Sequence, residues 1–173
     1  FKKCIENLLK KELLRIEQFG DYQILETEKT ISITHSILIN GEKKPINFVG
    51  QIDRVDSTKN GVRLVDYKTG LVRKIDLNVN GLNQLYKKDK AFQLFFYGLL
   101  WNENNLNGKD VTCQVITLKN TISPHLDLTF INKNKINYKS IIDFKNWIFE
   151  NIEAIYNTES YSHSNDNLFC ELC

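Results

Sequence analysis

The stretch GQIDRVDSTKNGVRLVDYKTG, residues 50–70, decides the fold. Its two apolar runs are separated by Asn60-Gly61, a dipeptide typical of tight hairpin turns. Two such runs joined by a turn predict a pair of antiparallel strands. The second run ends in a polar cluster that begins at Asp66, where a strand that serves only the core would remain apolar. We therefore expect this strand to carry a functional site at its end.

Asp66 and Lys68 form a pattern of an acidic residue, any residue and lysine, which occurs twice more in the chain. The copy that begins at Glu42 lies in a hairpin turn, where solvated charge is expected. The copy that begins at Asp143 lies within an amphipathic helix, whose polar side explains it. Only Asp66 and Lys68 interrupt an apolar strand, so the sequence favours them as the residues that carry chemistry.

The flanking sequence predicts an α/β (α+β) domain, built from a helix, three antiparallel strands, a helix, a strand parallel to the third, and a last helix. A crossover through a helix is what makes the fourth strand parallel. The expected elements are a helix over 1–17, a strand over 30–39, a strand from Pro45 to Val55, a strand over 62–68, a buried helix over 91–101, a strand over 111–118, an edge strand over 125–131 and a helix over 138–156.

The composition indicates one domain, because 173 residues can bury a single core. No run approaches the roughly 18 apolar residues of a membrane span. The chain starts at Phe1, has no methionine and shows no secretion signal, so we expect an intracellular, cytoplasmic fragment of a longer protein. A net charge of +2 is too small to indicate a nucleic-acid partner. Residues 71–90 are predicted to form a mobile basic loop that either contacts phosphate or is simply solvated.

The chemistry follows from which side chains share a face. Residues two apart on a strand point the same way, so Asp66 and Lys68 project together and Tyr67 points away. Asp53 on the antiparallel strand adds a carboxylate, and a divalent cation resolves the repulsion between two carboxylates. Mg²⁺ or Mn²⁺ fits, whereas Zn²⁺ lacks histidine or thiolate partners here. A lysine beside the cation can serve a water that attacks a phosphodiester; the alternative is a salt-bridge network that includes Arg54.

Three motifs follow one another in the order GQIDRVD from Gly50, LVDYKTG from Leu64, and QLFFY with Gln93 and Tyr97. Together they resemble the PD-(D/E)XK nuclease superfamily, and within it the RecB and AddB branch. The motifs span residues 50–97, and the order of elements extends the resemblance over most of the chain.

The resemblance implies that Asp53, Asp66 and the backbone carbonyl of Tyr67 hold the catalytic metal. It implies that Lys68 serves the attacking water. Gln93 and Tyr97 share a helical face and would position the lysine or the DNA backbone. The residues expected to support the site or to lie near DNA are therefore Gln93, Tyr97, Thr69, Gly70 and Arg54.

Members of that branch usually carry a histidine ligand on the first helix, and this chain has none there. Glu12, near the middle of the apolar face of residues 1–17, is one candidate to replace it, unless its side chain reaches out to a neighbouring lysine. Glu28, just before the first strand, is a second candidate, and a residue upstream of Phe1 is a third. Three histidines are expected to be structural or solvated: His35, His125 and His163.

Cys170 and Cys173 form a CELC motif in the polar tail of residues 160–173. In the AddB branch, a C-terminal CxxC, one further cysteine and a distant upstream cysteine hold a 4Fe-4S cluster, which needs four thiolates. The resemblance implies such a cluster in the full-length protein only. Cys4 and Cys113 lie in apolar patterns typical of the core.

The sequence therefore predicts a Mg²⁺-dependent deoxyribonuclease, with exonuclease activity favoured over endonuclease activity. It is expected to work within a helicase-nuclease in recombinational DNA repair or in degradation of foreign DNA, with DNA and the helicase domain or subunit as partners. The alternative is a catalytically degenerate nuclease fold that binds nucleic acid or acts as a scaffold.

Overall fold

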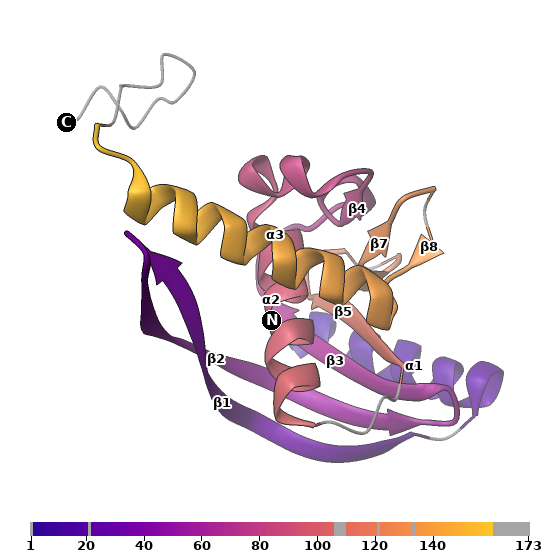
Figure 1. Cartoon of the computed structure of the whole chain (residues 1–173). Helices are drawn as coiled ribbons and strands as arrows, with labels where there is room; N and C mark the ends of the chain where they lie inside the picture. The colour runs from indigo at the N-terminus through magenta and orange to yellow at the C-terminus, as the bar shows by residue number, and fades with distance from the viewer. Residues whose placement is uncertain (1, 21, 106–109, 121, 133, 161–173) are drawn as a thin grey trace.

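A computed structural model describes residues 2–20, 22–105, 110–120, 122–132 and 134–160 of the chain. Its centre is a five-stranded sheet in the order β1-β2-β3-β5-β6, and α2 and α3 pack together above it (Figure 1). The elements are α1 Lys2–Phe19, β1 Gln23–Ile39, β2 Glu42–Thr58, β3 Gly61–Lys68, η1 Lys74–Asp76, β4 Asn78–Val79, η2 Leu82–Lys87, α2 Asp89–Asn104, β5 Val111–Thr117, β6 His125–Asp127, β7 Thr129–Phe130, β8 Asn134–Lys135 and α3 Tyr138–Asn157.

The sheet topology confirms the predicted fold class. β1, β2 and β3 form an antiparallel meander, and the chain then crosses through α2 to β5, which pairs parallel with β3. In that register Asp66 lies opposite Val115 and Lys68 lies opposite Thr117. The strand that carries the motif is therefore an inner strand, paired on both sides over Val62–Val65 and with β5 alone over Asp66–Lys68.

The hairpin of β1 and β2 is longer than the sequence predicted. β2 pairs with β3 only over Arg54–Thr58, so the outer part of the hairpin extends past the meander toward α3 (Figure 1). Pro45 lies in this outer part, where β2 has no partner on its second side and a missing N–H is tolerated. At the tip, the backbone N–H of Asn40 donates to Asn157 Oδ1 at 2.7 Å, which ties the hairpin to α3.

α2 is buried against the sheet, as its apolar sequence predicted. Leu94, Phe95, Leu99 and Leu100 are fully buried in one cluster with residues of β2, β3 and β5. Gly50 makes this close packing feasible, because a Cβ there would lie only 2.6 Å from Leu100 Cδ1. The same helix carries Gln93, so its depth against the sheet determines the distance between Gln93 and β3.

The structure contradicts the predicted mobile loop over residues 71–90. This segment folds into η1, β4 and η2 because Leu77, Val79 and Leu85 are buried in the core. β4 also pairs with β7 in a second, three-stranded sheet of order β4-β7-β8. The predicted edge strand over 125–131 was wrong in its extent. The strand is interrupted at buried Leu128, so β6 joins the five-stranded sheet and β7 joins the three-stranded sheet.

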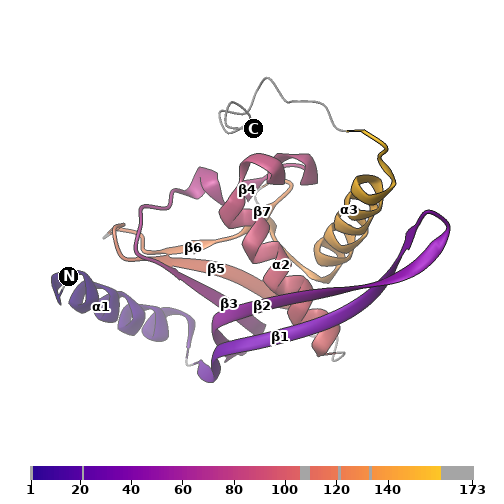
Figure 2. The same ribbon diagram turned by 90° about the vertical axis from the view of Figure 1, so that its left-hand side faces the viewer.

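α1 has an orientation that its sequence did not predict. Its apolar residues Ile5, Leu9 and Leu13 are 37%, 59% and 61% exposed, whereas Glu12 is 8% exposed. The reason lies in the sheet face that Glu12 contacts, which carries Arg54 and His125 rather than apolar side chains. α1 lies at the opposite end of the molecule from α3 (Figure 2). None of the helices in the described part of the chain has the length and apolar character that crossing a membrane requires.

Candidate active site

The end of the β2–β3 ladder brings Asp53 and Asp66 together. The last residues that pair across this ladder are Arg54 and Val65. Beyond them, the side chain of Asp53 rather than the backbone of β2 makes the next hydrogen bond to β3. Asp53 Oδ2 accepts a hydrogen bond from the backbone N–H of Tyr67 at 2.7 Å. This contact anchors the Asp53 carboxylate beside the segment that joins Asp66 to Lys68.

Asp66 is the most buried acid of this group, with only 2% of its surface exposed. Burial raises the pKa of its carboxyl group, the nearby Lys68 lowers it, and the negative charge of Asp53 raises it further. Lys68 Nζ lies 3.0 Å from Asp66 Oδ1, to which it donates, and 2.8 Å from Oδ2. Although Oδ2 is close to the ammonium, no donor among the described residues is aligned with it. One carboxylate oxygen is therefore left with acceptor capacity.

α2 holds Lys68 from the other side. Lys68 Nζ donates to Gln93 Oε1 at 2.8 Å, and Gln93 Nε2 donates to the Tyr97 hydroxyl at 2.7 Å. Gln93 and Tyr97 are one helical turn apart, so both reach the same edge of the sheet. Lys68 is thus held between Asp66 on its own strand and Gln93 on the helix.

Glu28 lies near the same centre. Burial raises the pKa of Tyr97 and its contact with Gln93 lowers it, while the charges of Asp66, Asp53 and Glu28 all raise it. Glu28 is exposed, has a left-handed backbone with φ of 51°, and accepts a hydrogen bond from Gln51 Nε2 at 2.7 Å. Of the two glutamates predicted as extra ligands, Glu28 is the one whose charge contributes to the raised pKa of Tyr97.

The end of β5 supports the loop that follows Lys68. Thr117 Oγ1 donates to the carbonyl of Gly70 at 2.6 Å, and the backbone N–H of Leu118 donates to the carbonyl of Lys68 at 3.0 Å. Thr117 is fully buried, whereas Thr69 in the loop is exposed. Sequence reasoning missed Thr117, because a threonine inside a strand gives no functional signal of its own.

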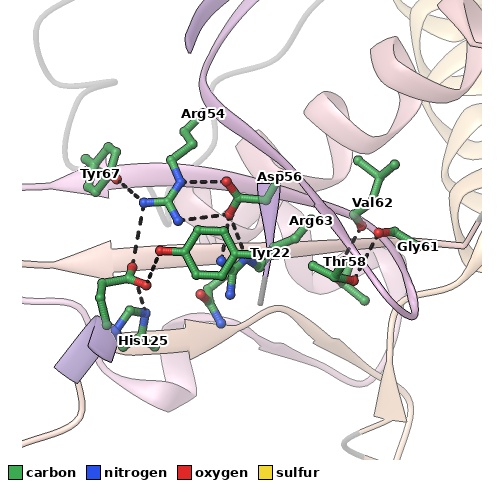
Figure 3. A network of polar contacts seen from close by, with 12 residues as sticks. Tyr22, Arg54, Asp56, Thr58, Gly61, Val62, Arg63, Tyr67 and His125 are labelled. Atoms are coloured by element: carbon green, nitrogen blue, oxygen red, sulfur yellow. Dashed lines mark hydrogen bonds and ion pairs between the residues drawn. The ribbon is translucent and has the colours of Figure 1, made fainter. Parts of the chain in front are cut away.

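The structure corrects the expectation for Arg54. Neighbouring residues of a strand point to opposite faces, so Arg54 and the Tyr67 ring lie on the face away from Asp66. Arg54 Nε and Nη2 donate to Asp56 at 2.7 and 3.0 Å, and Nη1 donates to the Tyr67 hydroxyl at 2.8 Å (Figure 3). Only 7% of Arg54 is exposed. Its donors serve Asp56 and Tyr67, so it is not placed to contact DNA.

Glu12 belongs to the same buried network and is not brought to Asp53 and Asp66. Its carboxylate accepts from the Tyr22 hydroxyl at 2.8 Å and lies 3.7 Å from Arg54 Nη1. Arg63 completes the network by donating to Asp56, and its guanidinium lies over the Tyr22 ring (Figure 3). The charged residues alternating along β2 and β3 were the sequence signal for this polar face.

The histidines in the described residues are structural. His35 Nε2 lies 2.8 Å from Glu103 Oε2, which links β1 to α2. His125 packs 3.9 Å from Glu12, and neither of its ring nitrogens has a hydrogen-bond partner among the described residues. Burial lowers the pKa of His125 to about 4. His163, Cys170 and Cys173 lie outside the described residues.

The donor set suits a hard divalent cation. Mg²⁺ prefers oxygen ligands, and three are close together here: the carboxylates of Asp53 and Asp66 and the backbone carbonyl of Tyr67. No donor among the described residues is aligned with Oδ2 of Asp66. Within the described part of the chain, however, no three acidic, histidine or cysteine side chains gather closely enough to hold a metal by themselves. Any cation here must complete its shell with backbone, water or substrate oxygens.

Two carboxylates and a lysine held by a helix thus lie together at the end of a meander that is followed by a parallel crossover. The model of the PD-(D/E)XK nuclease superfamily matches residues 2–173, and the chain belongs to this superfamily, whose members are generally metal-dependent nucleases. A search of curated protein sequences gave no significant match. Among solved structures, one titled "Crystal structure of SSO0001" is similar over 98% of this chain and 67% of that chain, with 16% identity and a TM-score of 0.38, which is too low to bear on function.

Proposed function

We propose that this chain is a Mg²⁺- or Mn²⁺-dependent deoxyribonuclease that hydrolyses phosphodiester bonds. Asp53, Asp66 and the backbone carbonyl of Tyr67 would hold the cation, and Lys68 would act on the attacking water. The observation that carries this proposal is the placement of Lys68, held at 3.0 Å from Asp66 and 2.8 Å from Gln93. A lysine that served only as a surface charge would not need two fixed partners.

The contacts of Lys68 leave it able to act on the substrate. An ammonium group has three N–H donors, and Asp66 and Gln93 take two of them. The third is available to orient a water or to stabilise negative charge that develops on a phosphate oxygen. A bound divalent cation would supply further charge neutralisation at the same phosphate. Asp66 and Gln93 aim the lysine, and Tyr97 in turn fixes the Gln93 amide.

The test is cleavage of single- and double-stranded DNA with Mg²⁺ by the wild type and by Lys68→Ala and Asp66→Asn. We expect both variants to lose roughly 100-fold or more of the rate, the usual effect of removing a transition-state contact. Lys44→Ala is the matched control, because Lys44 belongs to the decoy copy of the motif in the first hairpin. Equal rates for wild type and Lys68→Ala would refute the assignment.

The finer features of the proposal rest on the motif resemblance. We propose a RecB/AddB-like domain that acts inside the cell within a longer helicase-nuclease in DNA repair or foreign-DNA degradation, as an exonuclease. Cys170 and Cys173 would then join further cysteines around a 4Fe-4S cluster in the full-length protein. Iron and sulfide analysis of the full-length protein, beside Cys170→Ser, tests the cluster, and end-labelled against circular DNA tests exonuclease action.

A degenerate nuclease fold that only binds nucleic acid is the second candidate. It is favoured by the absence of a cluster of three ligating side chains among the described residues and by the engagement of Glu12 elsewhere. Calorimetric titration with Mn²⁺ distinguishes the two. Binding that weakens in Asp66→Asn and in Glu28→Gln supports the nuclease, with Glu28 as an added ligand. DNA binding without metal binding or cleavage supports the degenerate form.

A further inference from the structure

A pocket beside the candidate site is bounded by the loop after β3, by η1 and by the start of α2. It is lined by Leu71, Arg73, Ile75, Lys87, Asp89 and Lys90, among others. Leu71 is three residues after Lys68, a stretch of chain that spans at most about 11 Å. Lys90 precedes Gln93 by three helical residues, a rise of about 4.5 Å. Part of the pocket lining therefore lies within about 11 Å of Lys68 along the chain.

The pocket carries four basic side chains, those of Arg73, Lys87, Lys88 and Lys90, against the two carboxylates of Asp76 and Asp89, and this excess of positive charge suits a phosphate chain. Arg73 has 72% of its side chain exposed, and its ion pair with Asp76 is loose at 3.7 Å. Lys87 is exposed, and no partner for it is found in the described part of the chain. Lys88 plays a different part, because its Nζ donates to the carbonyls of Ile75 and Asn78 and so holds η1 against α2.

The pocket also presents apolar surface, which a site for phosphate alone would not need. Leu71 is 59% exposed and Ile75 is 66% exposed, and both line the pocket together with Arg73 and Lys87. In a duplex the faces of the bases are stacked inside the helix and only the backbone and groove edges are accessible. In a single strand the base faces are free to pack on side chains while the phosphates meet basic groups.

We infer that this pocket binds unpaired DNA next to the bond that is cleaved. The inference rests on the proposed function for the choice of DNA and deepens it by assigning a surface and a strand state. Because Lys68 and Leu71 are at most about 11 Å apart, and a stacked strand rises about 3.4 Å per nucleotide, the contact lies within about three nucleotides of the scissile phosphate.

Equilibrium binding with the metal removed tests this surface without cleavage. We would measure the anisotropy of a labelled single-stranded oligonucleotide and of the matching duplex with the wild-type chain. Arg73→Ala with Lys87→Ala removes two phosphate contacts, so the logarithmic salt slope for the single strand should fall by about 1.4, and affinity at physiological salt by about tenfold. Leu71→Ser with Ile75→Ser should weaken single-strand binding and leave duplex binding unchanged.

The double variant Lys43→Ala with Lys44→Ala, at the exposed start of β2, is the charge-matched control and should bind like the wild type. Unchanged single-strand binding by both pocket variants would overturn the inference even if the wild type cleaves DNA. Equal losses on single strand and duplex in Leu71→Ser with Ile75→Ser would overturn the preference for unpaired DNA. Weakened binding by the pocket variants in a chain that never cleaves would uphold this surface and refute the nuclease proposal instead.

Discussion

The contact with Gln93 fixes the orientation of the Lys68 side chain. Its amide accepts from Lys68 through one end and donates to Tyr97 through the other, so its orientation is determined by both neighbours. A long lysine side chain loses rotamer freedom when it is held in this way, and that loss occurs on folding rather than at the moment of reaction. The glutamine therefore acts through Lys68 and is a positioning residue.

Gln93→Leu should lower kcat for DNA cleavage by about 10- to 100-fold, the effect typical of removing a supporting contact, with KM unchanged. Tyr97→Phe keeps the glutamine and removes only the hydroxyl behind it, so its rate should lie between those of Gln93→Leu and the wild type. Initial rates over a range of DNA concentrations give both constants. A wild-type kcat for Gln93→Leu would contradict this role.

His125 makes the stability of the protein depend on pH. Its pKa falls from 6.5 to about 4, chiefly because it is buried; Glu12 opposes this shift, and Arg15, Arg63 and Arg54 add to it. Below about pH 6.5 the unfolded chain binds a proton at this histidine that the folded chain does not. The contribution of neutral His125 to the free energy of unfolding is therefore fully present above that pH. It is lost as the pH falls toward 4.

The loss from this one group amounts to roughly 3 kcal/mol once the pH reaches 4, at about 1.4 kcal/mol per pKa unit. Urea unfolding between pH 7 and 4.5 measures it, beside His125→Leu, which carries no proton at this position. The wild type should lose more stability than the variant over this range. Parallel curves for the two proteins would show that His125 does not contribute.

At the scale of secondary structure, the end of β5 supports the loop that carries Thr69 and Gly70. Thr117→Val deletes the hydroxyl that donates to the Gly70 carbonyl and nearly preserves side-chain volume. We expect a cost in stability of about 1 kcal/mol. We also expect a fall in cleavage rate of about tenfold, because Lys68 begins the loop that loses its support.

Thr112→Val is the matched control for Thr117→Val. Thr112 lies on the same strand and its hydroxyl donates to the carbonyl of Val62 at 3.4 Å, at the end of β3 away from the site. Its removal should leave the cleavage rate unchanged. If both valine variants cleave at the same rate, the loop does not depend on β5.

Elements with a clean hydrophobic period were predictable from the sequence, and elements made by tertiary contact were not. The alternation in residues 30–39 predicted the second half of β1 but missed residues 23–29, so Glu28 lies within the strand and not before it, whereas the uniformly apolar residues 91–101 gave α2 to within three residues at each end. β4 and β7 have two residues each and show no period, because they exist only where buried Val79 and Phe130 meet. The basic side chains around them suggested a loop, since a solvated loop and a short, docked segment have similar compositions.

On the scale of the whole molecule, the two faces of the five-stranded sheet have different roles. One face packs on α2 and carries Asp66 and Lys68, and the other carries the charged network that receives Glu12 from α1. Sequence reasoning assigned Asp53, Asp66 and Lys68 to one place because strand alternation is local. It could not assign Glu12, because a helix pattern shows which residues share a face but not which sheet face they meet.

Glu12→Gln tests this division. The network balances Arg54 and Arg63 against Asp56 and Glu12, so loss of one carboxylate leaves a buried positive charge without compensation. Stability should fall by about 3 kcal/mol, while the folded protein should cleave DNA at the wild-type rate.

Glu6→Gln is the control on the same helix, because its ion pair with Lys2 is exposed and long at 3.9 Å. Urea unfolding should place this variant within about 0.5 kcal/mol of the wild type. A loss of Mn²⁺ affinity in Glu12→Gln, with stability intact, would restore Glu12 as a metal ligand.

The parallel pairing of β3 with β5 also determines the stage of folding at which the candidate active site is completed. The meander of β1, β2 and β3 closes through short turns. By contrast, 42 residues separate Lys68 from Val111, so pairing β3 with β5 closes a long loop. The conformational entropy of that loop is lost before the contacts between the two strands form. The meander brings Asp53 and Asp66 together early, whereas Gln93 and Thr117 arrive with the crossover. During synthesis, Lys68 therefore leaves the ribosome well before Gln93, which holds it from α2, and Thr117, which supports the loop after it.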